Sequence, residues 1–185
     1  SNRPFRIIYT GAHGESNDLY NIINTAKLLD KYPIKFFFVG DGPEKKSLIK
    51  KASGLKNVIF RDPVPKSEIP KLLKEFDSII VSLKNTKLFS YGVSPNKLYD
   101  AYALGKPVIS TIEGEVNDEI NHYNLGVTAR PGDPLMLSKQ IKKLYLMDVN
   151  KRQEMGQNGV ILCKKIYSRA KTNKLYLNII NRINS

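Results

Sequence analysis

Residues 94–109 read SPNKLYDAYALGKPVI and join a helix start, a carboxylate and a buried strand. Ser94 and Pro95 favour the start of a helix, whose first backbone N–H groups have no partner within the helix and can bind an anion such as phosphate. Asp100 follows about one and a half turns later, where its carboxylate can accept hydrogen bonds from sugar hydroxyls. The Gly-Lys-Pro sequence at 105–107 ends the helix before an apolar strand. One short segment therefore predicts a site for the phosphate and ribose of a nucleotide.

Length and composition indicate one domain. The 185 residues contain a single cysteine, Cys163, which rules out an internal disulfide and fits a reducing compartment. No apolar run approaches the roughly 18 residues of a membrane span. The chain starts almost directly into a strand, which predicts that no signal peptide is present. We therefore expect a cytoplasmic protein.

The charge is strongly positive and unevenly distributed. The formal net charge is +13, and residues 134–185 hold 11 Lys/Arg against 2 Asp/Glu. Basic surfaces attract nucleic acid, anionic lipid or phosphorylated substrates, although a solvated lysine-rich surface has the same composition. Nucleic acid is the weaker alternative, because no aromatic-rich strand pattern or recognition helix accompanies the charge. Peripheral attachment of residues 134–185 to the inner face of the cell membrane stays open.

Short apolar runs alternate with helical patterns along the chain. Strands are expected at Phe5–Thr10, Ile34–Val39, Asn57–Phe60, Ser78–Leu83, Lys106–Ser110 and Gly126–Ala129, and an all-helical segment from Asp133 to about Asn184. This alternation, with continuous apolar strands, predicts an α/β fold: a Rossmann-like parallel sheet of about six strands with helices on both faces. Such sheets bind ligands at the carboxyl ends of their strands.

Two glycine-rich turns fall at that edge. Gly11, Ala12, His13 and Gly14 follow the first strand, where glycines let backbone N–H groups approach a phosphate, or simply form a tight turn. His13 is a candidate contact for a pyrophosphate rather than a base. After the second strand, the run at 40–43 contains the candidate residues Gly40, Asp41 and Gly42, which would shape the floor of a pocket. Asp41 either binds a ribose or only forms the turn.

Three further features bear on a binding site. Val64 lies between two prolines, and this stiff loop either presents backbone groups to a flat base or is a rigid connection. Lys97 lies in the first turn of the helix that starts near Ser94, where a cation opposes the helix dipole. This position suits a bound phosphate, so Lys97 is the candidate phosphate stabiliser. The two histidines and Cys163 lack metal-ligand spacing, and no metal site is predicted.

In their order, these motifs resemble the C-terminal, donor-binding half of a GT-B glycosyltransferase of the family 4 type. The Ser-Pro-Asn-Lys variant is similar to the bacterial branch that transfers N-acetylated amino sugars in surface-polysaccharide synthesis. The segments that carry the resemblance are Tyr9–Gly11, Phe38–Pro43, Asn57–Phe60, Pro63–Pro65, Ser94–Leu98, Gly105–Ile109 and Gly132–Pro134.

The resemblance implies that residues 1–185 are a single donor-binding domain, and that the acceptor domain, which precedes it in this architecture, is absent from these residues. It implies a nucleotide-diphosphate sugar donor, usually UDP-linked, transfer with retention, and no required metal or cofactor. The acceptor would be a glycan or a lipid-linked molecule bound by the other domain. Residues 1–185 alone would bind nucleotide without transferring sugar.

Position by position, the resemblance assigns roles to individual residues. Val64 would frame the base and Asp100 would bind the ribose hydroxyls. The N–H groups around Asn96 and Lys97, together with those of the turn at 11–14, would hold the pyrophosphate. The sequence differs from the usual pair of family glutamates, because Gly92 takes the place of the first and Asp100 that of the second.

Other activities remain as alternatives. A nucleotide-sugar epimerase of the same architecture would need further acid–base carboxylates, for which Glu113 and Glu115 after the fifth strand are candidates. A basic module that binds nucleic acid or a membrane surface would rest on the net charge alone.

Overall fold

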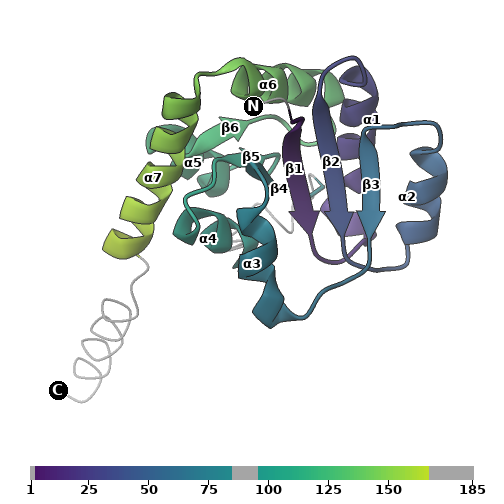
Figure 1. Ribbon diagram of the computed structural model, residues 1–185, viewed down its shortest axis with the longest axis horizontal. Helices are drawn as coiled ribbons and strands as arrows, with labels where there is room; N and C mark the ends of the chain where they lie inside the picture. Colours follow the sequence, from purple (N-terminus) through teal and green to yellow (C-terminus); the bar gives the residue numbers. More distant parts are fainter. Residues whose placement is uncertain (1–2, 85–95, 167–185) are drawn as a thin grey trace.

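A six-stranded parallel sheet forms the centre of the protein, in the order β3-β2-β1-β4-β5-β6 (Figure 1). The computed structural model describes residues 3–84 and 96–166. The strands are β1 (Phe5–Thr10), β2 (Ile34–Val39), β3 (Val58–Arg61), β4 (Ser78–Val81), β5 (Val108–Ser110) and β6 (Gly126–Thr128). The predicted α/β fold with about six parallel strands is therefore confirmed.

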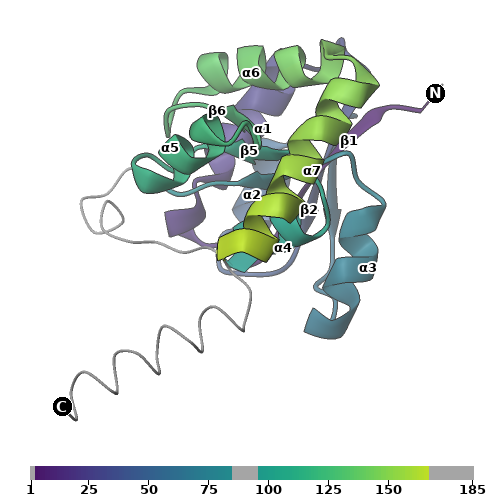
Figure 2. The same ribbon diagram turned by 90° about the vertical axis from the view of Figure 1, so that its left-hand side faces the viewer.

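Helices cover both faces of the sheet (Figures 1 and 2). One face carries α1 (Leu19–Leu28), α2 (Lys45–Lys51) and α6 (Pro134–Leu146), whose apolar residues share one core cluster. The other face carries α3 (Ile69–Lys74), α4 (Asn96–Ala103), α5 (Glu115–His122) and most of α7 (Val149–Ile166). Two short 3₁₀ turns, η1 (Glu15–Asn17) and η2 (Lys66–Glu68), precede α1 and α3.

The strands are apolar along their length because each contributes to two cores. In β1, Ile7 and Tyr9 belong to the core beneath α1, whereas Ile8 belongs to the core beneath α4. All three side chains are at most 1% exposed. Side chains of successive strand residues point to opposite faces, so a strand covered on both sides buries every position.

The Gly-Lys-Pro sequence ends α4 as predicted. Gly105 has a φ of +63°, the left-handed conformation that favours glycine. Its N–H donates to the carbonyl of Tyr102 (3.0 Å), and the N–H of Lys106 donates to that of Ala101 (3.0 Å). These two bonds form a Schellman motif, which satisfies carbonyls at the end of the helix.

Glycines of α7 let that helix approach α4 closely. A Cβ on Gly156 would lie 1.9 Å from the carbonyl oxygen of Gly105, and one on Gly159 would lie 3.1 Å from the Cα of Tyr102. Both distances are shorter than ordinary packing contacts. The position of α4 is therefore fixed by backbone contact with α7.

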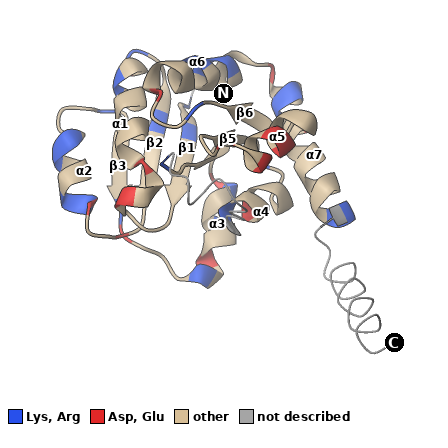
Figure 3. Cartoon of the chain, turned by 180° about the vertical axis from the view of Figure 1, so that it is seen from behind, with Lys and Arg blue, Asp and Glu red and all other residues tan. Residues whose placement is uncertain are grey.

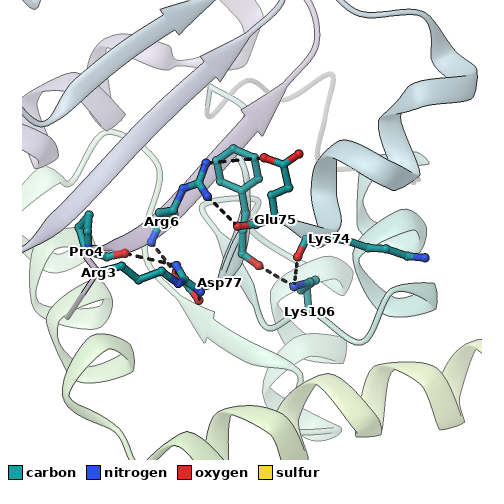
Figure 4. A network of polar contacts seen from close by, with 8 residues as sticks. Arg3, Pro4, Arg6, Lys74, Glu75, Asp77 and Lys106 are labelled. Carbon is teal, nitrogen blue, oxygen red and sulfur yellow. Dashed lines mark hydrogen bonds and ion pairs between the residues drawn. The ribbon is translucent and has the colours of Figure 1, made fainter. Parts of the chain in front are cut away.

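A polar network joins the amino ends of the strands (Figure 4). The Lys106 amine donates to the carbonyls of Lys74 (2.9 Å) and Phe76 (2.6 Å) at the end of α3. Burial lowers the pKa of this lysine. The Asp77 carboxylate accepts two bonds from the Arg3 guanidinium, at 2.8 and 2.6 Å. The network ties the α3–β4 connection to the starts of β1 and β5, at the edge opposite the predicted site.

Among residues 3–84 and 96–166, no helix has both the length and the apolarity needed to cross a membrane.

Candidate functional site

The candidate site lies at the carboxyl edge of the sheet, where the strand order reverses between β1 and β4. In open α/β sheets the connections on either side of such a point diverge and leave room for a ligand. The loops after β1, β2 and β4 and the start of α4 belong to this edge. Most of the residues predicted for the site therefore come from one edge of the sheet.

Backbone hydrogen bonds lock the two glycine-rich turns together. The N–H of Gly11 donates to the carbonyl of Val39 (2.9 Å), and that of His13 donates to the carbonyl of Asp41 (2.8 Å). In return, the carbonyl of His13 accepts from the N–H of Glu44 (3.0 Å). The first two donors are therefore already engaged within the protein. In the part of the chain that the structure describes, the N–H groups of Ala12 and Gly14 have no such partner.

Glycine is required in the second turn because the first lies directly against it. A Cβ on Gly40, whose φ is +149°, would lie 1.9 Å from the carbonyl oxygen of Gly11. A Cβ on Gly42 would lie 2.6 Å from that of His13. Two adjacent backbones thus form the floor of the site, and Ala12 is exposed above it.

The side chain of His13 points into the protein. It is fully buried, with its ring centroid 5.9 Å from that of Phe60 and 6.2 Å from that of Tyr9. Neither ring nitrogen has a hydrogen-bond partner among the described residues. Burial, and next the charge of Lys45, lower the pKa of the imidazole, which favours its neutral form. Contact between this ring and a pyrophosphate would require the turn to open, so that role stays a prediction.

Lys97 crosses from α4 to the first turn. Its Nζ donates to the Tyr9 hydroxyl (3.1 Å) and lies 4.3 Å from the centroid of the Tyr9 ring. That hydroxyl in turn donates to the carbonyl of Ala12 (2.9 Å). Gly11 has a φ of +133°, a backbone conformation that favours glycine, and a Cβ there would lie 2.4 Å from the Lys97 amine. Among the described residues, no carboxylate pairs with this lysine.

The surroundings of Lys97 favour an incoming anion. Burial lowers the pKa of its amine to about 8. Burial also raises the pKa of Tyr9, so that its hydroxyl stays protonated. A phosphate placed beside the amine would stabilise the ammonium form, since an opposite charge a few ångströms away raises the pKa of a lysine. The arrangement is a positioned cation at a glycine turn, with aromatic and backbone neighbours.

Asp100 lies three residues beyond Lys97, on an adjacent part of the α4 surface. Its side chain is exposed, and partial burial of the carboxyl raises its pKa. Asn96 begins α4, in agreement with a helix start near this position. The predicted site residues Ser94 and Pro95 lie outside the described residues, as does Gly92.

Asp41 and Val64 occupy the loops that follow β2 and β3. The Asp41 carboxylate accepts from the N–H of Gly42 (2.8 Å) while remaining exposed. It therefore forms the turn, and its exposed carboxylate is also accessible to a ligand. Val64 is half-buried against the core beneath α3 and α4. Roles for either residue in binding a nucleotide stay predictions.

Sequence reasoning missed Asp18, which together with Lys84 tethers the loops around the site. Asp18 has a φ of +49° and accepts from the N–H of Gly132 (3.2 Å), and burial raises the pKa of its carboxyl. The backbone N–H of Lys84 donates to the carbonyl of Ser16 (2.8 Å), and its amine pairs with Glu15 (2.8 Å). The tolerance of Asp for left-handed backbone was the available signal. Within the described ranges, no three His, Cys, Asp or Glu side chains gather to hold a metal ion.

Comparison with known proteins identifies the architecture and its relatives. The sequence model of the family described as "Glycosyl transferases group 1" matches residues 4–146. The probable glycosyltransferase WbjE of Pseudomonas aeruginosa is 26% identical over 146 residues, covering 77% of this chain and 36% of WbjE. The putative colanic acid biosynthesis glycosyl transferase WcaI of Escherichia coli (strain K12) is 35% identical over 109 residues, covering 58% of this chain and 26% of WcaI.

Among solved structures, Anabaena HepE in complex with UDP and glucose superposes with a TM-score of 0.81 at 17% identity. The match covers 97% of this chain and 49% of HepE, and it shows a common fold. The predicted likeness to one half of a GT-B enzyme is thereby confirmed for the fold. The chain spans about a third or less of the curated relatives it matches.

Proposed function

The chain belongs to the group 1 glycosyl transferases, and on that basis we propose that it is the donor-binding half of an enzyme that transfers a sugar from a UDP-linked donor. The observation that carries the proposal is Lys97, an ammonium held over the first glycine turn without a carboxylate partner among the described residues. A cation in that position suits a diphosphate. HepE, which shares the fold, was crystallised with UDP and glucose.

In this proposal the site works by electrostatic stabilisation. The bond from the sugar to the β-phosphate breaks during transfer, and negative charge builds up on the phosphate that leaves. Lys97 and the N–H groups at the start of α4 would stabilise that charge, joined by those of Ala12 and Gly14. Because these groups are already in place, little reorganisation is needed when the charge develops.

The other candidate residues are assigned to the ribose and the base of the nucleotide. Asp100 would accept hydrogen bonds from the ribose hydroxyls, and Val64 would frame the uracil. Retention at the anomeric carbon, an N-acetylated amino sugar as donor and the lack of a required metal are parts of the same proposal. The name of WcaI supports a role in polysaccharide synthesis.

We further propose that residues 1–185 are one donor domain and that a glycan or lipid-linked acceptor is bound by another domain. Coverage of 49% of HepE supports this division. On its own the donor domain is expected to bind nucleotide without robust turnover. The epimerase and nucleic-acid alternatives are not favoured, because the family and the relatives' names indicate glycosyl transfer.

Titration calorimetry of the chain with UDP, UDP-GlcNAc, GDP and NAD at moderate salt tests the proposal. We expect selective binding of the uridine nucleotides. Lys97→Ala should weaken UDP binding at least about tenfold, since hydrogen bonds to charged groups contribute roughly 1.5–3 kcal/mol. Asp100→Ala should weaken it several-fold. Lys71→Ala, an exposed lysine on α3, is the matched control and should leave the affinity unchanged. UDP binding that none of these substitutions alters would refute the assignment of the site.

A further inference from the structure

One helical layer carries lysines without acids. Helices α1, α2 and α6 contain no Asp or Glu between them. Their basic residues are Lys27, Lys45, Lys46, Lys50, Lys51, Lys139, Lys142 and Lys143. On the opposite face, α5 alone carries Glu115, Asp118 and Glu119. Figure 3 shows this layer from behind the sheet, with lysines on α2 and α6 and acidic residues on α5 at the other side of the molecule.

Few of these lysines are paired, although Asp18, Glu44 and Asp133 stand at the starts of the three helices. Of its eight lysines, only Lys45 forms an ion pair within the described ranges, with Asp62 at 3.0 Å. Lys142 lies over the ring of Tyr32, with its amine 4.7 Å from the centroid. The other six lysines are exposed. A field of one sign over three adjacent helices attracts an extended anionic partner.

Apolar side chains lie among these lysines. Along α6, Leu135 and Leu146 are 57% and 65% exposed, with Lys139 and Lys143 between them on the same side. The buried residues of α6, Leu137, Ile141 and Leu144, face the core. Leu28 on α1 and Ile49 on α2 are also about half exposed, at 49% and 46%. Exposed leucines beside lysines are typical of helices that lie in a membrane interface. Proteins that bind single-stranded nucleic acid instead present aromatic side chains for stacking.

A small notch between α1 and α2 adds a feature on the scale of one headgroup. Its volume is about 140 Å³, and its lining residues include Lys27, Lys51 and Ser53. Two ammonium groups and a hydroxyl are the donors that a lipid phosphate requires. Ile23 and Leu55 form its apolar part.

We propose that the α1–α2–α6 layer docks on an anionic lipid surface, with Leu135 and Leu146 at the interface and a headgroup phosphate in the notch between α1 and α2. The sequence left open a peripheral attachment through residues 134–185; in the structure α6, from that segment, lies beside two helices from the first third of the chain. None of the residues proposed to contact lipid is assigned to the nucleotide, although Lys45 of this layer begins α2 at the carboxyl edge, where its charge acts on His13. The proposal therefore does not depend on the identity of the nucleotide.

Co-sedimentation with lipid vesicles tests the proposal. The chain should bind vesicles of phosphatidylcholine with about one third phosphatidylglycerol, bind pure phosphatidylcholine weakly, and lose affinity as salt is raised. Lys139→Glu with Lys143→Glu should weaken binding by roughly thirtyfold or more, since each basic residue near an anionic surface contributes appreciably. Lys71→Glu with Lys74→Glu on α3 makes the same change in net charge on the opposite face and is the matched control. An equal loss of vesicle affinity in both double variants would overturn the assignment of lipid binding to the α1–α2–α6 layer.

Two further measurements distinguish lipid docking from attraction by charge alone and from nucleic-acid binding. Leu146→Ser should weaken vesicle binding several-fold without changing net charge; an unchanged affinity would overturn the role given to the apolar side chains. Duplex DNA should compete poorly, and binding of DNA in preference to the vesicles would overturn a lipid partner.

UDP titrations of the same variants should match the parent chain. Vesicle binding without UDP binding would refute only the proposed function. UDP binding without vesicle binding would refute only the proposed lipid-binding surface.

Discussion

The lowered pKa of Lys97 predicts that UDP binding depends on pH in a defined window. In the free protein, burial lowers the pKa of the amine to about 8. A bound diphosphate next to the amine would raise the pKa again, because it stabilises the charged form. Binding above pH 8 therefore requires the uptake of a proton. Affinity should be nearly constant up to about pH 7, fall about twofold by pH 8 and fall further as the pH rises.

The size of the effect follows from the protonation of the free amine. With a pKa of about 8, the amine is roughly nine-tenths protonated at pH 7 and roughly one-tenth protonated at pH 9. The affinity for UDP should therefore fall about tenfold between these two values. The terminal phosphate does not contribute to this change, since the second pKa of a phosphate is about 6.

Calorimetry at pH 7, 8 and 9 in buffers of different ionisation enthalpy measures both the affinity and the protons taken up. Near pH 9 we expect close to one proton taken up per UDP, and Lys97→Met should abolish both the uptake and the pH dependence. Lys71→Met serves as a control, because this exposed lysine on α3 belongs to no part of the candidate site. Constant affinity from pH 7 to 9, or a Lys97→Met variant that retains the parent's pH dependence, would refute the reasoning.

Three other substitutions test the partner of the Lys97 amine, the packing of α7 on α4 and the polar network at the opposite edge, with Gly54→Ala as a control. Tyr9→Phe removes the acceptor for the lysine amine and the donor to the Ala12 carbonyl, so UDP affinity should fall about threefold to tenfold in calorimetry. Gly156→Ala should lower the free energy of unfolding by more than about 2 kcal/mol in urea titrations, although alanine is the better helix former by about 1 kcal/mol. At Gly54 nothing lies within 4 Å of a Cβ, and the only penalty for Gly54→Ala is the left-handed backbone (φ +85°), so this control should cost about 1–2 kcal/mol. Lys106→Met should cost about 1–2 kcal/mol by the same assay, because two carbonyls at the end of α3 lose a charged donor.

The sheet was predictable because its signals are local. Strands buried on both faces read as continuous apolar runs, and β1 and β2 begin and end at the residues predicted for them. The strand β4 ends two residues before its predicted end, and β5 begins two residues after its predicted start. The parallel pairing with neighbouring strands, and not the apolarity of their own residues, sets how far they extend. Boundaries depend on partners distant in the sequence, which a local pattern does not contain.

The site was predictable as a location but not as a set of contacts. The order of strands and glycine turns placed the turn at 11–14 and Lys97 at one edge, and the structure brings them together. The engagement of the Gly11 and His13 N–H groups by the second turn could not be foreseen, because it requires the distance between two loops. The same holds for the buried ring of His13. A glycine in a turn signals close approach of some group, which for Gly40 and Gly42 is another backbone.

Under the proposed function, the engagement of those N–H groups gives a reason for a lysine at this edge. The turn at 11–14 would then offer a diphosphate only part of its donors, and Lys97 of α4 would supply further positive charge. The amine of a long lysine side chain has a defined position only if its helix is fixed. The far end of α4 is held by the Schellman motif and by contact with Gly156 of α7. Tyr9 then fixes the amine itself. Loosening α7 with Gly156→Ala should therefore weaken UDP binding as well as folding, and unaltered affinity in a folded variant would argue against this coupling.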